Sequence, residues 1–194
     1  MPYTAEHKAA TRDRIVSAAR RLFNCNGFSQ VTIEQIMAEA ELTRGGFYHH
    51  FGSKEQLFTE VVACYVTCNP LAVEARNGGI EYTNARFVAR RLIDLYLSDM
   101  VFDDVSQHCP LYALPSDARN LGEASREAYT DLIRGMSQAF RAALAGRDDG
   151  DAKAQAIIAL CVGGMVLART TADVALRKSL RASAHAQAVR MLEE

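Results

Sequence analysis

The fold is decided by residues 32–58, which read TIEQIMAEAELTRGGFYHHFGSKEQLF. The pairs Thr32/Gln35 and Ser53/Gln56 have the three-residue spacing of a capping box, in which side chains satisfy free amides at the start of a helix. Between these two starts the apolar residues recur with helical spacing, and one short turn interrupts them. The stretch therefore predicts two short helices followed by the beginning of a longer one.

A further helix precedes this stretch. Its apolar stripe at i, i+3, i+4, i+7 and i+8 consists of Ile15, Ala18, Ala19, Leu22 and Phe23. The next two helices are separated only by a turn around Glu41-Leu42, and this arrangement predicts a helix-turn-helix unit. Its last helix, from Thr43 to near Gly52, is then expected to lie in the DNA major groove with its first residues facing base edges.

The composition of that last helix favours DNA contact over simple packing. Gly45 and Gly46 each cost about 1 kcal/mol relative to Ala in a helix, but they let the backbone lie against another surface. Phe47 and Phe51 lie one turn apart and are expected to anchor the helix inward. The side chains left pointing outward are Arg44, Tyr48 and His49. Arg is the commonest bidentate reader of guanine, whereas Tyr and His donors suit phosphates.

Three helix starts also fall in one neighbourhood, at Thr32, Thr43 and Ser53. Each presents free backbone amides and a partial positive charge, which favour a phosphate group. Capping alone explains any one of these residues, so the prediction depends on their combination.

With these features, the sequence resembles the DNA-binding domain of the TetR/AcrR (tetracycline-repressor-like) family of transcriptional regulators. The resemblance is continuous over about residues 11–58 and is strongest in the blocks GFSQVTI (27–33), AEAELTRGGFYHHF (38–51) and SKEQL (53–57). Family members usually carry Gly where this chain has Glu41. The resemblance implies DNA contacts from Thr32, Thr43, Arg44, Gly45, Tyr48, His49 and Lys54.

The net charge conceals a difference between the two ends of the chain. The 194 residues include 22 Lys+Arg and 23 Asp+Glu, a net charge of −1, which by itself argues against a nucleic-acid partner. Through Lys54 there are seven basic and five acidic residues, a charge of +2, which leaves −3 for the rest. This asymmetry is weak evidence for a DNA-facing N-terminal unit joined to an acidic one.

Composition and cysteine usage indicate a soluble protein of the cytoplasm. The chain is 49% hydrophobic and 23% charged, which is ordinary for a globular protein. Its five cysteines are irregularly spaced with no secretory segment before them, so we expect free thiols in a reducing compartment. The longest apolar run, residues 156–168, is shorter than the roughly 20 residues that a membrane span needs, which favours a buried helix.

Beyond residue 69 the apolar spacing stays helical. Helices are predicted over about 82–103, 110–116, 118–145, 151–169 and 173–192, with loops at 76–79 and 146–151. The predicted fold class is therefore all-α with about nine helices. We expect a DNA-binding domain at 1–54 and a helical ligand-binding and dimerisation domain at 55–194.

The last two predicted helices are rich in small and apolar residues, which lets helices approach closely. A helix as apolar as 156–167 must be covered on more than one side, and a symmetric partner is the common solution, although a central helix of a monomer is the alternative. The predicted dimer interface comprises Ile157, Leu160, Gly163, Gly164, Leu167, Leu180 and Ala184. A twofold dimer is expected to read a roughly palindromic operator on double-stranded DNA.

All seven aromatic residues after Tyr65 lie between Tyr82 and Phe140. At helical spacing such residues are more often core than binding site, but a cavity with a few polar groups is what the resemblance implies for a small-molecule effector. The candidate effector residues are Phe87, Arg91, Tyr96, Met100, His108, Cys109, Tyr112, Tyr129 and Phe140.

The leading hypothesis is a repressor that a small-molecule effector releases from its operator. One alternative is a repressor switched by oxidation or electrophile modification of Cys109, which lies beside His108 at a helix start. A small helical enzyme is less favoured, because the chain has no Gly-rich phosphate loop, His-Glu-x-x-His or Gly-x-Ser-x-Gly motif. An effector-free DNA-binding protein is a further alternative. No cofactor is expected, and Cys64 and Cys68 lack a second ligand pair for a metal.

Overall fold

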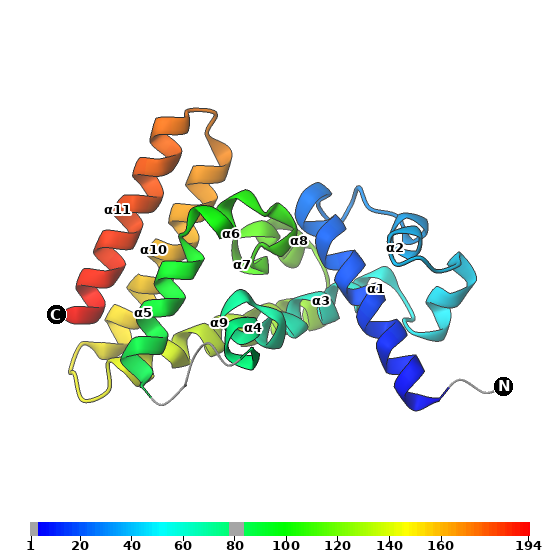
Figure 1. Cartoon of the computed structure of the whole chain (residues 1–194), viewed down its shortest axis with the longest axis horizontal. Coiled ribbons are helices and arrows are strands. Elements are labelled where there is room, and N and C mark those ends of the chain that lie inside the picture. The colour runs from blue at the N-terminus through cyan, green and yellow to red at the C-terminus, as the bar shows by residue number, and fades with distance from the viewer. Residues whose placement is uncertain (1–3, 78–83) are drawn as a thin grey trace.

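A computed structural model describes residues 4–77 and 84–194, and the regular structure in these ranges is entirely helical. Figure 1 shows an elongated molecule, with α1 (Ala5–Asn26) and α2 (Ile33–Glu39) at one end. At the other end lie α10 (Gly150–Thr170) and α11 (Val174–Glu193). The predicted all-α class is confirmed.

The N-terminal unit begins its helices where the capping residues predict. Thr32 forms a complete capping box with Gln35 at the start of α2. Ser53 accepts a hydrogen bond from the Gln56 amide at the start of α3 (Lys54–Cys68), although the Gln56 side chain accepts from Gly52 instead of Ser53. Between them lies η1 (Arg44–His49), a short 3-10 helix in place of the predicted α-helix to Gly52.

The middle of the chain is divided more finely than the sequence indicates. After α3 come α4 (Pro70–Arg76), α5 (Ala85–Tyr96), α6 (Asp99–Asp103), η2 (Val105–Gln107), α7 (Pro110–Ala113), α8 (Pro115–Asn120) and α9 (Glu123–Ala143). The predicted start of a helix at 82, and residues 78–79 of the predicted loop, lie outside the described residues.

A buried arginine explains why the predicted helix over 82–103 breaks into α5 and α6. Leu97 ends α5, and the Ser98 hydroxyl caps α6 by accepting a hydrogen bond from the Val101 amide. Arg181 of α11 donates to the Leu97 carbonyl oxygen at 3.2 Å and to the Asp99 carboxylate at 2.5 Å. This contact comes from a residue far along the chain, so local periodicity does not reveal it.

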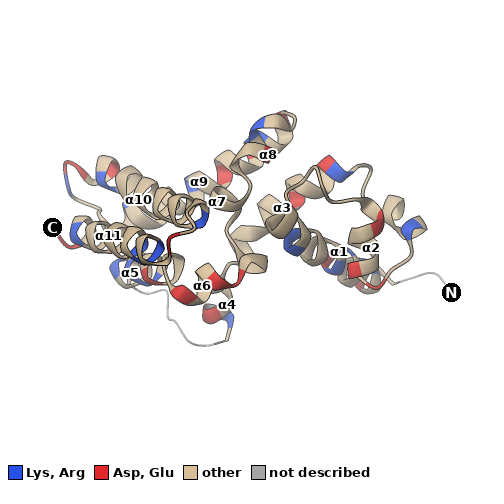
Figure 2. Cartoon of the chain, turned by 90° about the horizontal axis from the view of Figure 1, so that it is seen from above, with Lys and Arg blue, Asp and Glu red and all other residues tan. Residues whose placement is uncertain are grey.

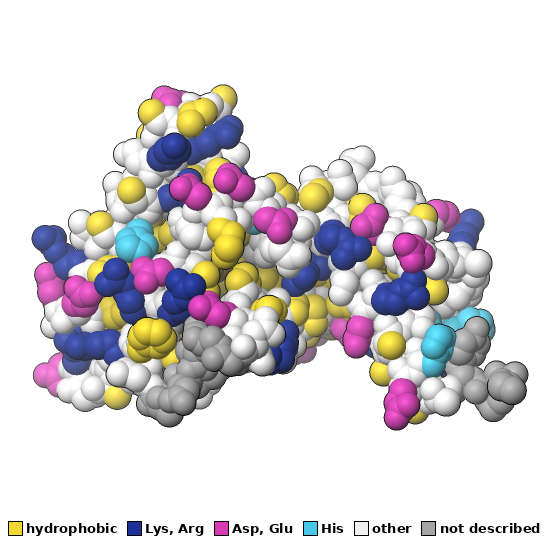
Figure 3. Space-filling view, in the orientation of Figure 1, with side chains coloured by type: hydrophobic (Ala, Val, Ile, Leu, Met, Phe, Trp, Pro, Cys, Tyr) yellow, Lys and Arg dark blue, Asp and Glu magenta, His cyan; other side chains and the backbone are white. Residues whose placement is uncertain are grey.

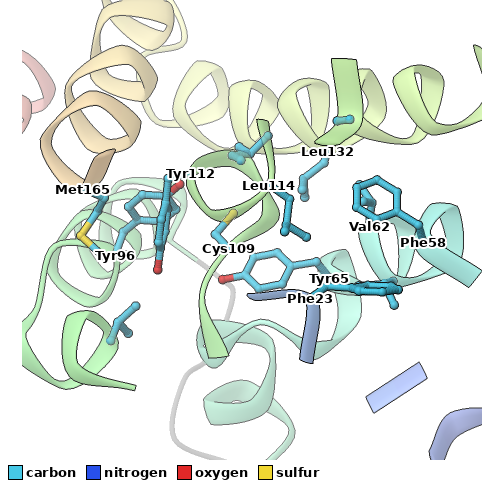
Figure 4. Close-up of a cluster of buried hydrophobic side chains, with 14 of the residues drawn as sticks. Phe23, Phe58, Val62, Tyr65, Tyr96, Cys109, Tyr112, Leu114, Leu132 and Met165 are labelled. Atoms are coloured by element: carbon cyan, nitrogen blue, oxygen red, sulfur yellow. The ribbon is translucent and has the colours of Figure 1, made fainter. Parts of the chain in front are cut away.

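One apolar core runs through the whole molecule. Phe23 of α1 and Phe58 of α3 pack with ring centroids 5.9 Å apart, and the same core continues to Met165 of α10. Figure 4 shows this cluster, with Tyr65 pointing its hydroxyl toward Cys109. The core crosses the predicted domain boundary at residue 54, because α3, which begins at that residue, packs against both α1 and α9.

Charged groups are spread over both ends of the molecule. Figure 2 shows Lys and Arg along α1 and beyond α2, with Asp and Glu interspersed among them. Several arginines of α1 are held by other elements, as Arg21 is by Glu39 of α2 at 2.9 Å. Part of the positive charge of the N-terminal unit is therefore neutralised by ion pairs within the chain.

Helices α10 and α11 form a close antiparallel pair. A Cβ added at Gly164 would lie 2.7 Å from the Ala184 Cβ, closer than real Cβ atoms approach. α10 is also long and apolar enough, by length and composition, to cross a membrane. Its buried residues nevertheless pack within the helical bundle, among them Ile157, Cys161 and Met165.

The close spacing of α10 and α11 predicts that alanine in place of Gly164 destabilises the protein. Gly164→Ala is expected to lower the free energy of unfolding by about 1–3 kcal/mol, because the new methyl group overpacks the contact with Ala184. Gly135→Ala in α9 is the matched control, since a Cβ at that exposed helical position meets nothing within 4 Å. Urea unfolding of both variants measures the difference, and equal stabilities contradict the predicted contact.

Candidate nucleic-acid interface and internal cavity

The η1 segment presents one face to the core and one to solvent, as the sequence predicts. Phe47 and Phe51 are 0% and 1% exposed. Tyr48 is 62% exposed, and four other predicted DNA-contacting residues are also exposed on this segment and at its start: Thr43, Arg44, Gly45 and His49. These five residues therefore share one surface, which no part of the described chain covers.

The turn before η1 adopts a conformation that favours glycine. Glu41 has φ 55°, and among the described residues it is the one non-glycine with positive φ. The turn is closed by hydrogen bonds from the Glu41 amide to Ala38 and from the Leu42 amide to Met37. The chain therefore keeps the left-handed turn at a position where a side chain adds strain.

Space around the two glycines of η1 supports close approach of another molecule. A Cβ at Gly45 meets nothing within 4 Å, so the protein interior does not require glycine there. At Gly46 a Cβ would lie 3.5 Å from the Met37 side chain, an ordinary contact. The small residue at 45 thus leaves the outer backbone of η1 accessible to a base edge or a phosphate.

Arg44 is held in position by an acidic partner on α2. Its Nε lies 2.8 Å from Oε1 of Glu34, and both side chains remain largely exposed. The pKa of Glu34 is lowered, mainly by a hydrogen bond from its own backbone amide. The ion pair orients the guanidinium at the protein surface and leaves its terminal nitrogens for other acceptors.

Two other predicted DNA contacts have clear structural roles. Thr32 is exposed but uses its hydroxyl to accept from the Gln35 amide. Lys54 donates from Nζ to the carbonyl oxygens of Phe28 and Val31, at 2.9 and 2.8 Å, and lies over the Phe28 ring. Lys54 therefore ties the loop before α2 to the start of α3.

A surface hollow beside η1 adds residues that the sequence reasoning missed. It lies between the start of α1 and η1, and Figure 3 shows histidines gathered at this end of the molecule. Its lining includes Lys8 and Thr11 of α1 together with His49 and His50. Burial lowers the pKa of His50, and the positive charges of Lys8 and Arg12 lower it further. Lys8 thus brings positive charge to the hollow beside η1, where a phosphate of a bound DNA strand would lie, and the basic residues ahead of Ile15 were the available signal.

Arg12 joins this surface to α3. Its guanidinium makes a bidentate pair with Glu60 and donates to the His50 carbonyl oxygen, and it stacks 4.1 Å over the Phe51 ring. These contacts connect α1, α3 and the end of η1 through one guanidinium group.

The second hollow is an internal cavity of about 230 Å³ between α3, α4, α5, α6, α7 and α9. Apolar side chains dominate its walls, and no described lining residue is a Lys, Arg, Asp, Glu or His. The larger side chains that line the cavity are those of Tyr65, Leu71, Val88, Leu92, Leu95, Tyr96, Leu111, Leu132 and Met136.

The ionisable groups at this cavity are uncharged near neutral pH. Burial raises the pKa of the Tyr65 and Tyr96 hydroxyls well above 10, and it raises the pKa of Cys109 to about 12. The Asn69 amide is committed to the backbone, donating to the Tyr65 and Val66 carbonyl oxygens. The cavity is therefore neutral and mainly apolar.

The structure brings only two of the nine candidate effector residues, Tyr96 and Cys109, to this cavity. Phe87 and Met100 are exposed at 52% and 63%, and Arg91 pairs with Glu74 at 3.1 Å. The other four candidates pack beside the cavity or in the core. His108 donates from Nε2 to the Phe102 carbonyl oxygen, Tyr112 packs edge-on against Tyr96, Tyr129 donates to the Leu111 carbonyl oxygen, and Phe140 is fully buried. The stripe Val88, Leu92 and Leu95 was the sequence signal for the wall on α5.

The predicted dimer residues divide into two groups. Ile157, Gly164 and Ala184 are buried within the chain. Leu167 is 54% exposed, and the remaining residues, Leu160, Gly163 and Leu180, are half-buried. Leu176 and Val174 at the start of α11 add to the exposed apolar surface near the α10–α11 turn.

Comparison with known proteins identifies the family. Residues 15–61 match the family model described as bacterial regulatory proteins, tetR family. The HTH-type transcriptional repressor Rv1474c of Mycobacterium tuberculosis is 30% identical over 153 residues, covering 77% of this chain and 76% of that protein. The Transposon Tn10 TetC protein of Escherichia coli is 42% identical over 60 residues, but that match spans only 29% of the relative and 31% of this chain.

The fold is also similar over the whole chain. A solved TetR transcriptional regulator from Chloroflexus aurantiacus has a TM-score of 0.76 at 24% identity, with 97% of each chain covered. The chain belongs to the TetR family, and it is a transcriptional regulator of that class.

Proposed function

We propose that this regulator is a homodimeric, cytoplasmic repressor that binds a roughly palindromic operator and is released by a small uncharged effector. One observation supports the DNA contact above all others. Arg44, Tyr48 and His49 project together from the exposed face of η1, while Phe47 and Phe51 fix that segment to the core. An oriented Arg at the start of the second helix of a helix-turn-helix unit suits guanine readout in the major groove.

The cavity supports an effector that is apolar and neutral. A charged ligand would lose its hydration without gaining a partner, because the described lining offers no opposite charge. The volume of about 230 Å³ suits a molecule smaller than most drugs.

Two connections link this cavity to the DNA-binding unit. Tyr65, Val66 and Asn69 line it from the end of α3, whose other end begins beside η1. Val101 and Cys109 flank the segment containing η2, and Asn24 of α1 donates to the backbone of this segment at the Ser106 and His108 carbonyl oxygens. Ligand in the cavity shifts α3 and α1 together and favours a spacing of the two η1 segments that does not fit adjacent major grooves.

Dimerisation through α10 and α11 follows from the apolar surface that the chain leaves uncovered. Leu167, Leu176 and Val174 are each at least 45% exposed. A twofold partner covers such a patch with the same surface of a second copy.

Sensing at Cys109 is less favoured than effector binding. The Cys109 thiol is 2% exposed, and burial raises its pKa to about 12. Thiol reactivity depends on the thiolate, which is scarce at such a pKa.

The DNA-reading role of Arg44 predicts a specific loss of affinity. Arg44→Ala is expected to weaken binding to DNA flanking the protein's own gene about 10- to 100-fold, the usual effect of removing a base contact. Arg134→Ala, which removes an exposed Arg of α9, is the control. Fluorescence anisotropy at fixed salt measures both, and an unchanged affinity and sequence preference for Arg44→Ala contradicts the assignment.

The neutral cavity predicts selective binding of uncharged aromatic probes. At saturation, 2-naphthol is expected to raise Tm by about 2–4 °C, whereas the similarly shaped 2-naphthoate anion raises it little. Gly135→Phe should abolish the shift, because Gly135 lines the cavity with open space at its Cβ. Gly122→Phe is the control outside the cavity. Equal stabilisation by the anion rejects a neutral effector.

A charged residue on the exposed face of α10 is expected to disrupt the proposed dimer. Leu167→Glu is expected to convert a dimer to a species of 21.3 kDa, because two carboxylates near a twofold interface repel and desolvate. Ile133→Glu places the same change on the exposed side of α9 and should leave the dimer intact. Light scattering after size exclusion gives both masses; a Leu167→Glu dimer places the interface elsewhere.

A further inference from the structure

We propose that Cys64 and Cys68 of α3 form a peroxide-reactive dithiol site, and that its oxidation to an intrahelical disulfide weakens DNA binding. The site lies at the junction of α1, α3 and η2, at different side chains from the proposed effector cavity. The inference rests on the proposed function only for its DNA-binding consequence, since the thiol chemistry can be measured without DNA.

The two thiols already lie next to each other. Cys64 and Cys68 are one helical turn apart, and their Sγ atoms are 3.5 Å apart. Both residues are half-buried, and Cys64 lines an open surface hollow with Gln56, Thr59, Glu60 and Ala63. A small oxidant therefore reaches this pair, unlike the buried thiols of Cys109 and Cys161.

A buried arginine from another helix faces Cys68. Arg20 of α1 is 9% exposed, and its Nη1 lies 3.0 Å from the Cys68 Sγ atom. The same nitrogen lies 3.4 Å from the Cys68 carbonyl oxygen, and Nη2 donates to Gln107 of η2 at 2.8 Å. In the described part of the chain Arg20 makes no ion pair with a carboxylate, since the nearby Glu60 pairs with Arg12. The Cys68 thiolate is thus the anion available to a buried cation, which is costly to leave unpaired.

The protonation of the pair follows from this geometry. A hydrogen bond from Cys64, together with the Arg20 charge, lowers the pKa of Cys68 to about 7. The same hydrogen bond between the two thiols raises the pKa of Cys64. One thiolate and one thiol therefore coexist near neutral pH, which is the arrangement of an attacking and a resolving cysteine.

The chemistry balances with an organic or inorganic hydroperoxide as the oxidant. The Cys68 thiolate attacks the terminal peroxide oxygen, the O–O bond breaks, and the alkoxide or hydroxide leaves and takes a proton from water. The Cys64 sulfur then attacks the Cys68 sulfenic acid, and the sulfenic oxygen leaves as water with the Cys64 proton. Two thiols and one ROOH become one disulfide, ROH and H₂O.

The disulfide cannot form without distorting the end of α3. Cβ atoms four residues apart on a helix are about 5–6 Å apart, whereas a disulfide needs about 3.5–4.5 Å. The last turn of α3 must therefore change shape, and Arg20 loses its anionic partner at the same time. Because Arg20 also holds η2, oxidation alters how α1 and α3 pack, and so the position of η1.

Mass spectrometry of the full-length protein after treatment with cumene hydroperoxide tests the site directly. Cys64 and Cys68 share the tryptic peptide of residues 55–76, which is expected to lose two hydrogens. Cys64→Ser should instead leave a Cys68 sulfenic acid that dimedone traps, and Cys68→Ser should remove the fast reaction. Cys25→Ser, a change at an exposed cysteine, should leave it unchanged. Arg20→Gln should move the pH at half-maximal rate upward from about 7 by roughly 1–2 units. Faster oxidation of Cys25 than of Cys68, or no effect of Arg20→Gln, overturns the site.

Fluorescence anisotropy on the same samples tests the consequence. Oxidised wild-type protein is expected to bind operator DNA at least 10-fold more weakly than reduced protein, with recovery on adding dithiothreitol and no such change in Cys68→Ser. Disulfide formation with unchanged DNA affinity overturns the switch. Absence of DNA binding by the reduced protein rejects the proposed function instead, while the peptide analysis still decides the thiol chemistry.

Discussion

The burial of α3 between the N-terminal unit and the C-terminal helices is the constraint on which the rest of the structure depends. Phe58 packs against the rings of Phe23 and Phe28, and Tyr65, two turns later, closes the internal cavity. Because one helix satisfies both packings, the DNA-binding surface and the cavity cannot move independently. A short rigid rod with buried groups at both ends transmits displacement more directly than a flexible linker.

Two arginines of α1 hold α3 in place through polar contacts. Arg12 ties α1 to Glu60 near the start of α3, and Arg20 ties it to Cys68 at the end. Both guanidinium groups also hold backbone or side chains of a third element, His50 beside η1 and Gln107 in η2. The proposed effector and the proposed thiol oxidation would thus act on the same junction through different chemistry, one by filling apolar space and the other by removing an anion.

The predicted helix starts and the orientation of η1 were recoverable from the sequence because they depend on neighbours three or four residues away. The capping box at Thr32 and the burial of Phe47 and Phe51 are such cases. The candidate effector residues depend on packing between distant helices, and the structure brings only Tyr96 and Cys109 of the nine to the cavity. Phe87 and Met100 have the apolar character of a pocket wall, but they project to solvent because α5 and α6 turn other residues to the core, among them Ile93 and Val101.

The sequence by itself determined the all-α class, the helix-turn-helix unit and its outward side chains, since periodicity and capping are local properties of the chain. Only the tertiary structure decided that Lys54 binds the carbonyl oxygens of the preceding loop, and that Arg20 faces Cys68 across 48 positions of sequence. It also decided that the cavity is neutral, because its walls come from six helices. Such properties depend on which helix surfaces pack against each other, and the spacing of residues along the chain does not specify this.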